Sequence, residues 1–209
     1  MLGSSSTKVL TYVTATDAAG GGSPQTFATV SIGTAAYDRR VILAVAAGGG
    51  ATVGTVTGIT VGGVSATKIV EQLGAGNQTR SQIWIALVPS GTTADIILTY
   101  SASVSQFGIG VWNATGLSVN TAFASGGSTA DPGTATLACT GGGFCVSLAA
   151  TFNLSTSLTW TNVTEKYDQV QGTQLTHSGA SIATVGGTIA PSGDYASGTG
   201  DEAAVFATW

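Results

Sequence analysis

One histidine, two cysteines and ten carboxylates are the side chains of this sequence that could carry out acid–base, nucleophilic or metal chemistry. The histidine, His177, is followed by Ser178, but neighbouring residues of a strand point to opposite faces, so the two cannot form a nucleophile–base pair. No serine stands in the Gly-x-Ser-x-Gly pattern of a nucleophile elbow. We therefore expect no Ser-His-Asp catalysis, and we expect His177 to lie in a loop or to face solvent.

The carboxylates could serve a glycosidase or a calcium site. A glycosidase needs two carboxylates that face each other across the substrate, and nothing in the sequence pairs them. The candidates are Glu71, Asp95, Glu165, Asp168, Asp201 and Glu202. Calcium binding through Asp194, Asp201 and Glu202 is conceivable, but their spacing fits no known calcium loop. The sequence therefore predicts a protein that is not an enzyme, with no catalytic residue, no metal and no cofactor.

The two cysteines leave two alternatives open. Cys139 and Cys145 flank Thr-Gly-Gly-Gly-Phe, and on facing strands of a hairpin they could lie opposite each other. They are then either two small buried thiols in a reducing compartment or a disulfide. Zinc is not expected, because two thiols and one distant histidine fall short of four ligands.

The aromatic residues could stack on a sugar or fill a core. In a chain rich in small residues, large aromatic rings are the natural core fillers, and we expect Trp84 and Trp112 in that role. Trp160, between Thr159 and Thr161, is the best candidate for an exposed tryptophan. The sequence therefore predicts Trp160, together with Tyr195, as candidate contacts to a ligand or partner.

These residues must be positioned by β-strands, because short apolar segments recur along the chain and no window shows the apolar stripe of an amphipathic helix. Gly62-Gly63 predicts a tight hairpin that pairs Val61 with Val64. The apolar run 40–47 predicts a central strand buried on both faces, or packed under a loop. The other expected strands are 8–15, 27–32, 81–88, 95–100, 106–112, 134–140, 144–152, 158–162, 165–170, 175–185 and 203–209. This pattern predicts an all-β fold, an antiparallel β-sandwich of jelly-roll-like form.

The chain organisation follows from where the strands are interrupted. Residues 1–6 are expected to be a flexible N-terminal arm. The polar stretch 119–131 is expected to cross between two sheets or to form an exposed loop, and Gly141–Gly143 is expected to turn a hairpin. Pro191-Ser192-Gly193 echoes the turn predicted at Pro89-Ser90-Gly91. Because the strands on either side of 119–131 look alike, we expect 7–209 to form a single domain.

The composition excludes several partners. Charged residues make up 8% of the chain, against a usual value near ~25%. The six basic residues form no stripe that could neutralise phosphates, so no nucleic acid is expected as a partner. No run approaches the ~20 apolar residues of a membrane span, and no secretion signal is recognised, so no membrane partner is expected. A surface this poor in charge is expected to be partly covered in a homo-oligomer.

The segment SQIWIALVPSGTTADIILTYS, followed by GIGVWNATGL, resembles jelly-roll modules of virion structural proteins of tailed bacteriophages, such as head decoration proteins, head fibres and tail proteins. The resemblance implies a non-enzymatic structural protein, made in the host cytoplasm and located in the virion. It would dock on the capsid as a homo-oligomer, with other capsid or tail proteins as partners. The alternative is a carbohydrate- or receptor-binding module of a tail or fibre, with a host glycan as ligand. The resemblance assigns no functional residue.

Overall fold

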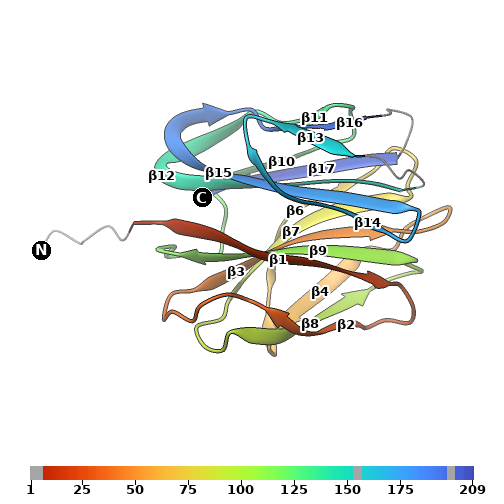
Figure 1. The fold of residues 1–209 in the computed structure, drawn as a ribbon, viewed down its shortest axis with the longest axis horizontal. Helices are drawn as coiled ribbons and strands as arrows, with labels where there is room; N and C mark the ends of the chain where they lie inside the picture. Colours follow the sequence, from red (N-terminus) through yellow and green to blue (C-terminus); the bar gives the residue numbers. More distant parts are fainter. Residues whose placement is uncertain (1–6, 153–156, 197–200) are drawn as a thin grey trace, which may run out of the picture.

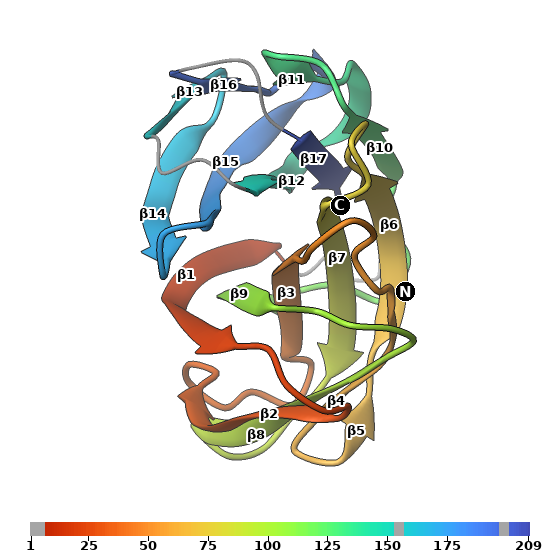
Figure 2. The same cartoon turned by 90° about the vertical axis from the view of Figure 1, so that its right-hand side faces the viewer.

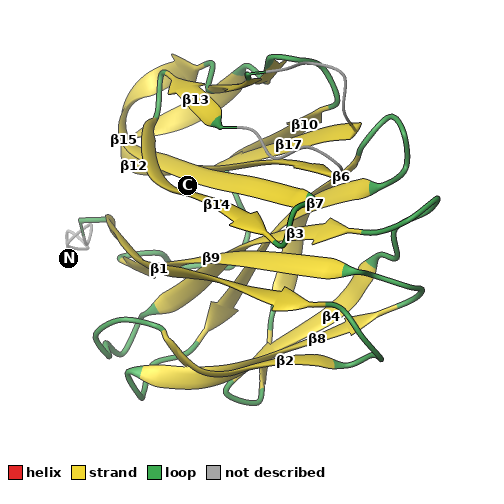
Figure 3. Ribbon diagram, turned by 45° about the vertical axis from the view of Figure 1, so that its right-hand side comes forward, coloured by secondary structure: helices red, strands yellow, loops and turns green. Residues whose placement is uncertain are grey.

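The computed structural model describes residues 7–152, 157–196 and 201–209, and within these ranges every regular element is a β-strand (Figure 3). All strand pairs are antiparallel. The predicted all-β antiparallel sandwich is therefore confirmed, while its jelly-roll form stays a prediction. The arm expected at 1–6 lies outside the described residues. None of the described segments is a helix that could cross a membrane.

The first half of the chain forms two sheets that pack face to face (Figures 1 and 2). The first outer sheet contains, in spatial order, β2 (Gln25–Ser31), β8 (Thr93–Tyr100), β4 (Val56–Val61) and β5 (Val64–Ser65). The first inner sheet contains β1 (Val9–Ala19), β9 (Gln106–Thr115), β3 (Arg40–Gly48), β7 (Thr79–Leu87) and β6 (Thr67–Leu73). The Gly62-Gly63 hairpin joins β4 to β5 in the predicted register, with both glycines at positive φ.

The second half forms two further sheets above the first pair (Figure 1). The second inner sheet contains β10 (Ala124–Ser128), β17 (Asp201–Thr208), β12 (Leu137–Phe152), β15 (Leu175–Ile189) and β14 (Thr164–Gln171). The second outer sheet contains β11 (Gly133–Thr134), β16 (Ser192–Tyr195) and β13 (Leu158–Thr161). The four sheets thus lie on one another as four layers.

Three apolar cores separate the four layers, and β3 contributes to two of them. Leu43 and Val45 point into the core under the first outer sheet, whereas Ile42 and Ala44 point into the middle core between the two inner sheets. The prediction of a central strand buried on both faces is therefore confirmed. The middle core takes side chains from both halves of the chain. The expectation that 7–209 is one domain stays a prediction.

The second half repeats the strand order of the first, apart from the short strand β5. In the two inner sheets β10, β17, β12, β15 and β14 occupy the places of β1, β9, β3, β7 and β6. In the two outer sheets β11, β16 and β13 occupy the places of β2, β8 and β4. The chain is therefore an internal repeat of one two-sheet sandwich.

Local contacts repeat along with the strand order. At the end of β8 the Tyr100 N–H donates to Ser23 Oγ at 3.0 Å, and at the end of β16 the Tyr195 N–H donates to Asp131 Oδ1 at 3.2 Å. These hydrogen bonds tie β8 and β16 to the residues that precede β2 and β11. A tyrosine thus ends the equivalent strand in each half, Tyr100 in β8 and Tyr195 in β16.

A β-bulge also recurs at one position. The pairing of β6 with β7 shifts between Lys68 and Val70, and the pairing of β14 with β15 shifts between Glu165 and Tyr167. The extra residue is Ile69 in the first half and Lys166 in the second. A bulge inserts one residue and bends an edge strand, so both inner sheets bend at the same place.

The two halves meet through equivalent faces. On β3, Ala46 is paired with Ser81 and Gly108, and on β12 its counterpart Ala150 is paired with His177 and Ala203. The Ser81 hydroxyl donates to the Ala203 carbonyl at 2.8 Å across the middle core. Its counterpart His177 lies against Gly108, the counterpart of Ala203. The contact between the halves therefore has the reciprocity of a two-fold dimer within one chain.

Two expectations about the second half need correction. The hairpin expected around Gly141–Gly143 is wrong, because β12 runs through it as one strand and absorbs the extra residue as a bulge against β15. The echo at Pro191-Ser192-Gly193 is not a second copy of the earlier turn, because Gly193 pairs with Trp160 inside the second outer sheet. The stretch 119–131 does cross from the first inner sheet to the second, and its middle forms β10.

Candidate functional site

Trp160 and Tyr195 come together on the second outer sheet, but they differ in exposure. Trp160 is partly exposed, and its Nε1–H donates to Ser178 Oγ at 2.8 Å while the ring meets Phe206 edge-on. Tyr195 is only 2% exposed, and its hydroxyl donates to the Ala150 carbonyl at 3.1 Å. The structure gives Tyr195 a packing role, and Trp160 stays a predicted contact. Trp84 and Trp112 are core residues, as predicted.

His177 is not at the surface, so the expectation of a loop or solvent-facing histidine is wrong. It lies in β15, is fully buried, and its Nε2 is 2.5 Å from Asp17 Oδ1. Gly108 leaves room for the ring, because a Cβ there would overlap it. Ser178 points to the opposite face of the sheet, toward Trp160, as the strand alternation predicted. The ring is enclosed between two sheets, where no substrate could reach it.

Asp201 holds the loop between β6 and β7, and the groups around its carboxylate are hydrogen-bond donors and not further ligands for a cation. Its carboxylate accepts the backbone N–H of Gly76 at 2.5 Å and also those of Gln78 and Thr79. Donors pointing at both oxygens occupy the lone pairs that a metal would need. Among the described residues no group of histidines, cysteines and carboxylates could hold a metal ion. Asp201 is therefore a positioning residue for this loop.

The cysteines are both free and both buried, so of the two alternatives the structure takes the pair of thiols. Cys139 and Cys145 lie on the same strand, β12, rather than on facing strands. Burial raises the pKa of the Cys145 thiol to about 11, although a hydrogen bond with Ser147 opposes the shift. A thiol that stays protonated is a poor nucleophile and a poor metal ligand.

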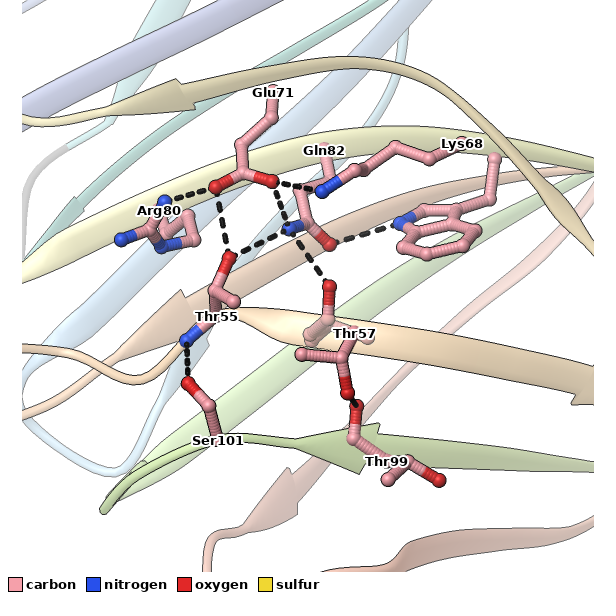
Figure 4. A network of polar contacts seen from close by, with 10 residues as sticks. Thr55, Thr57, Lys68, Glu71, Arg80, Gln82, Thr99 and Ser101 are labelled. Carbon is pink, nitrogen blue, oxygen red and sulfur yellow. Dashed lines mark hydrogen bonds and ion pairs between the residues drawn. The ribbon is translucent and has the colours of Figure 1, made fainter.

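The densest polar network of the described residues surrounds Glu71 on β6 (Figure 4). Its carboxylate accepts hydrogen bonds from Arg80, from Lys68, from the Thr55 hydroxyl at 2.8 Å and from the Gln82 amide at 2.9 Å. Gln82 in turn accepts the Trp84 Nε1–H at 2.8 Å. Both oxygens of Glu71 are occupied by side chains of the protein, so the network ties β6, β7 and the start of β4 together. We interpret it as structural.

The Glu71 network should make stability depend on pH. Burial would raise the pKa of Glu71, but hydrogen bonds from Lys68 and Thr55 and the charge of Arg80 outweigh it, so the pKa lies below its ordinary value of 4.5. The stabilisation is therefore present above the unfolded-state pKa and is lost as the pH falls through the folded-state pKa. We expect Glu71→Gln to lower the free energy of unfolding by about 1–3 kcal/mol at pH 7 and to flatten its acid dependence, as measured by urea denaturation.

Glu165→Gln is the matched control. Burial and the nearby charge of Asp168 raise the pKa of Glu165, so its charged form is disfavoured in the folded protein. Removing that charge should not lower stability at neutral pH. A Glu71→Gln protein with the acid dependence of the unmodified chain would show that the network does not stabilise the fold.

An open groove lies between the edge strands of the two inner sheets, and it gathers polar side chains that the core does not use. Its volume is about 430 Å³. It is lined by Lys8, Leu10, Thr11, Tyr12, Gly143, Phe144, Thr164, Lys166, Ser181, Ile182 and Ala183. These residues come from β1 and the residue before it, and from β12, β14 and β15. We call this site the basic groove; the sequence analysis missed it because its residues are far apart in the chain.

One end of the stack carries most of the large exposed apolar side chains. It is the end at which β1 begins and β9 stops, toward the left in Figure 1. The side chains are Val9, Tyr37, Leu87, Val119, Phe123 and Val185. Hydrogen bonds from Lys8 to Thr140 and from the Phe123 N–H to the Thr208 carbonyl join the two inner sheets there. We call this surface the apolar end.

The chain was compared with models of protein families, with curated proteins and with solved structures, and none of the three comparisons gave a match. Its function must therefore be argued from the two surfaces just described, the apolar end and the basic groove.

Proposed function

We propose that this chain is a non-enzymatic structural protein of a phage particle that docks on the capsid as a homo-oligomer. The observation that carries the proposal is the apolar end. Val185 is 97%, Tyr37 86% and Phe123 59% exposed, although each would be stabilised by burial. Exposed apolar side chains that share one end of the stack favour protein association at that end.

The rest of the molecule suits a building block. Three apolar cores hold four layers together, so the apolar end is presented by strand termini that pack on both sides. The carboxylates with buried partners, Asp201 and Glu71, serve the fold itself. A stack of packed sheets with exposed apolar side chains at one end fits a subunit that is held in place by contacts with neighbouring subunits.

The apolar end also gives a test of self-association. We expect Phe123→Ser combined with Val119→Ser to shift the purified protein from oligomer to monomer, because both changes remove exposed apolar surface from the same loop. Phe123 contributes its backbone N–H to Thr208, which the substitution keeps. The measurement is light scattering coupled to size exclusion, over a range of protein concentrations.

Val170→Ser is the control, since Val170 is 41% exposed at the other end of the molecule, near the turn that follows β14. It should leave the oligomer unchanged. If the unmodified chain is a monomer at every concentration, or if Val170→Ser dissociates it equally, self-association through the apolar end is contradicted.

The alternative function, a carbohydrate- or receptor-binding module, is favoured by one observation, the basic groove. Ligand binding in the basic groove and association through the apolar end are compatible in one particle protein, because the residues that line the groove are not among the exposed apolar side chains of that end.

A further inference from the structure

We propose that the basic groove binds a carbohydrate that carries a carboxylate, such as a sialic or uronic acid. This inference stands whether or not the chain belongs to a virion. Its volume of about 430 Å³ falls in the range of small-molecule sites, roughly 300–1,000 Å³. Three features of the groove support this ligand: its charge, its hydroxyl groups, and its difference from the equivalent place between β10 and β6.

The charge comes from the two basic side chains that are neither paired with a carboxylate nor bound to backbone carbonyls. Arg39 donates to four backbone carbonyls, and Arg40 donates to Asn120 and to the carbonyls of residues 38 and 117. Lys68 and Arg80 pair with Glu71. This leaves Lys8 and Lys166, and both line the basic groove.

Neither lysine forms an ion pair with a carboxylate of the described residues. Lys8 donates to the neutral Thr140 hydroxyl at 3.0 Å, and Lys166 pairs with no described acid. The groove lining contains neither Asp nor Glu. Asp168 on β14 points away, toward β13, where it accepts the Leu158 N–H at 3.2 Å. The groove is therefore complementary to an anion.

Hydroxyl groups and the aromatic residues Tyr12 and Phe144 line the groove together with the lysines. The Tyr12 ring is held in place by Trp112 and Tyr167, with centroids 5.6 and 5.9 Å away. Ser181 Oγ accepts the Trp112 Nε1–H at 3.3 Å, which leaves its own proton free to donate. The exposed Thr164, at the start of β14, adds another hydroxyl to the lining. Hydroxyl donors and acceptors beside an aromatic ring suit a sugar ring, whose edges are polar and whose faces are apolar.

The internal repeat shows that the fold does not require this arrangement. The bulged residue of β6 is Ile69, which packs against the middle core, whereas the bulged residue of β14 is the exposed Lys166. The equivalent place lies between β10 and β6, which also contact each other, as the Gly127–Gln72 contact shows. The two places thus differ at the bulge by the charge of Lys166.

An extended peptide is a poorer occupant than a sugar. Strand addition needs a regular edge, but β1 has an irregularity between Tyr12 and Thr14, and β14 has its bulge between Glu165 and Tyr167. Bulges and edge lysines both oppose pairing with another strand. The two strand edges that border the groove are therefore poorly suited to pairing with the backbone of an extended peptide.

The test is calorimetric titration of the purified chain with 3′-sialyllactose and with a uronic acid trisaccharide. Lactose serves as the neutral sugar, inorganic phosphate as the bare anion, and an acidic decapeptide as the extended chain. We expect binding of at least one acidic sugar, weakened about ten-fold or more by Lys166→Met and by Lys8→Met. Lys68→Met removes the same charge away from the groove and should leave the affinity unchanged.

Circular dichroism that matches the unmodified chain ensures that each variant is folded, and Lys166 is exposed, so its replacement should not disturb the core. Failure of both acidic sugars to bind would overturn the proposal. The role of the lysines would then be to protect the strand edges from pairing with another strand. Equal binding of lactose, phosphate or the peptide, or equal weakening by Lys68→Met, would also overturn the proposal.

Discussion

Deleting Phe206–Trp209 is expected to abolish folding of the whole chain. Residues 206–208 end β17, and Trp209 follows it; β17 lies between β10 and β12 in the second inner sheet and is buried along its length. Trp209 exchanges two backbone hydrogen bonds with Phe144, and the two rings lie 5.5 Å apart. Loss of two large buried rings alone costs about 3–5 kcal/mol each, against a total stability of about 5–15 kcal/mol.

The deletion is measured by expression of soluble protein and by far-ultraviolet circular dichroism. Phe206→Leu combined with Trp209→Phe is the control, because it keeps β17 and most of the buried volume, and it should fold with reduced stability. A soluble truncated chain with an unchanged β-type spectrum would contradict the placement of β17 at the centre of its sheet.

Asp201→Asn is expected to lower the free energy of unfolding by about 3–5 kcal/mol. The carboxylate is 4% exposed and accepts three backbone N–H groups of the loop between β6 and β7. Asparagine has the same shape, but its NH₂ group would face N–H donors that have no other acceptor at that point. The loss should appear in urea denaturation as a lower midpoint with an unchanged slope.

The control for Asp201 is Asp95→Asn. Asp95 is exposed and accepts a single backbone N–H, from Thr29, at 2.8 Å. Its replacement should cost about 1 kcal/mol or less, because water can take over the bond. Equal losses in the two variants would show that burial of Asp201 against the loop does not contribute to stability.

The sequence predicted those features of the fold that depend on local pattern. The Gly62-Gly63 hairpin follows from the conformational freedom of glycine, and the apolar run at 40–47 follows from burial of β3 on both faces. The continuous strand β12 was missed, because Gly141–Gly143 reads as a turn unless the length of its partner β15 is known. Local pattern does not report which strand lies opposite.

The internal repeat could not be recognised from residue types. Equivalent positions carry Ser81 and His177, or Ile69 and Lys166, which share no chemistry. What the halves share is the strand order, the position of a bulge and a tyrosine at the end of one outer strand, and these equivalences appear only after the strands pair. The echo at 191–193 falls between β15 and β16, the counterparts of β7 and β8, but Gly193 is paired within β16 instead of closing a turn.

The candidate surfaces were predicted only in part. The predicted exposure of Trp160 agrees with its partly exposed ring, whereas Tyr195 proved to be enclosed between sheets. The basic groove brings Lys8 together with Lys166 across the two halves, so no spacing in the sequence could reveal it. Burial of His177 depends on Gly108 and Asp17, which belong to the other half of the chain.

The central claim, a structural role in a phage particle, is tested most directly on native particles. Mass spectrometry of purified particles should detect the chain, and electron microscopy should locate it. The proposal predicts hundreds of copies on the capsid, with the apolar end facing neighbouring subunits. A handful of copies at a tail tip would favour the carbohydrate-binding alternative. Particles that form without any copy of the chain would contradict the structural role.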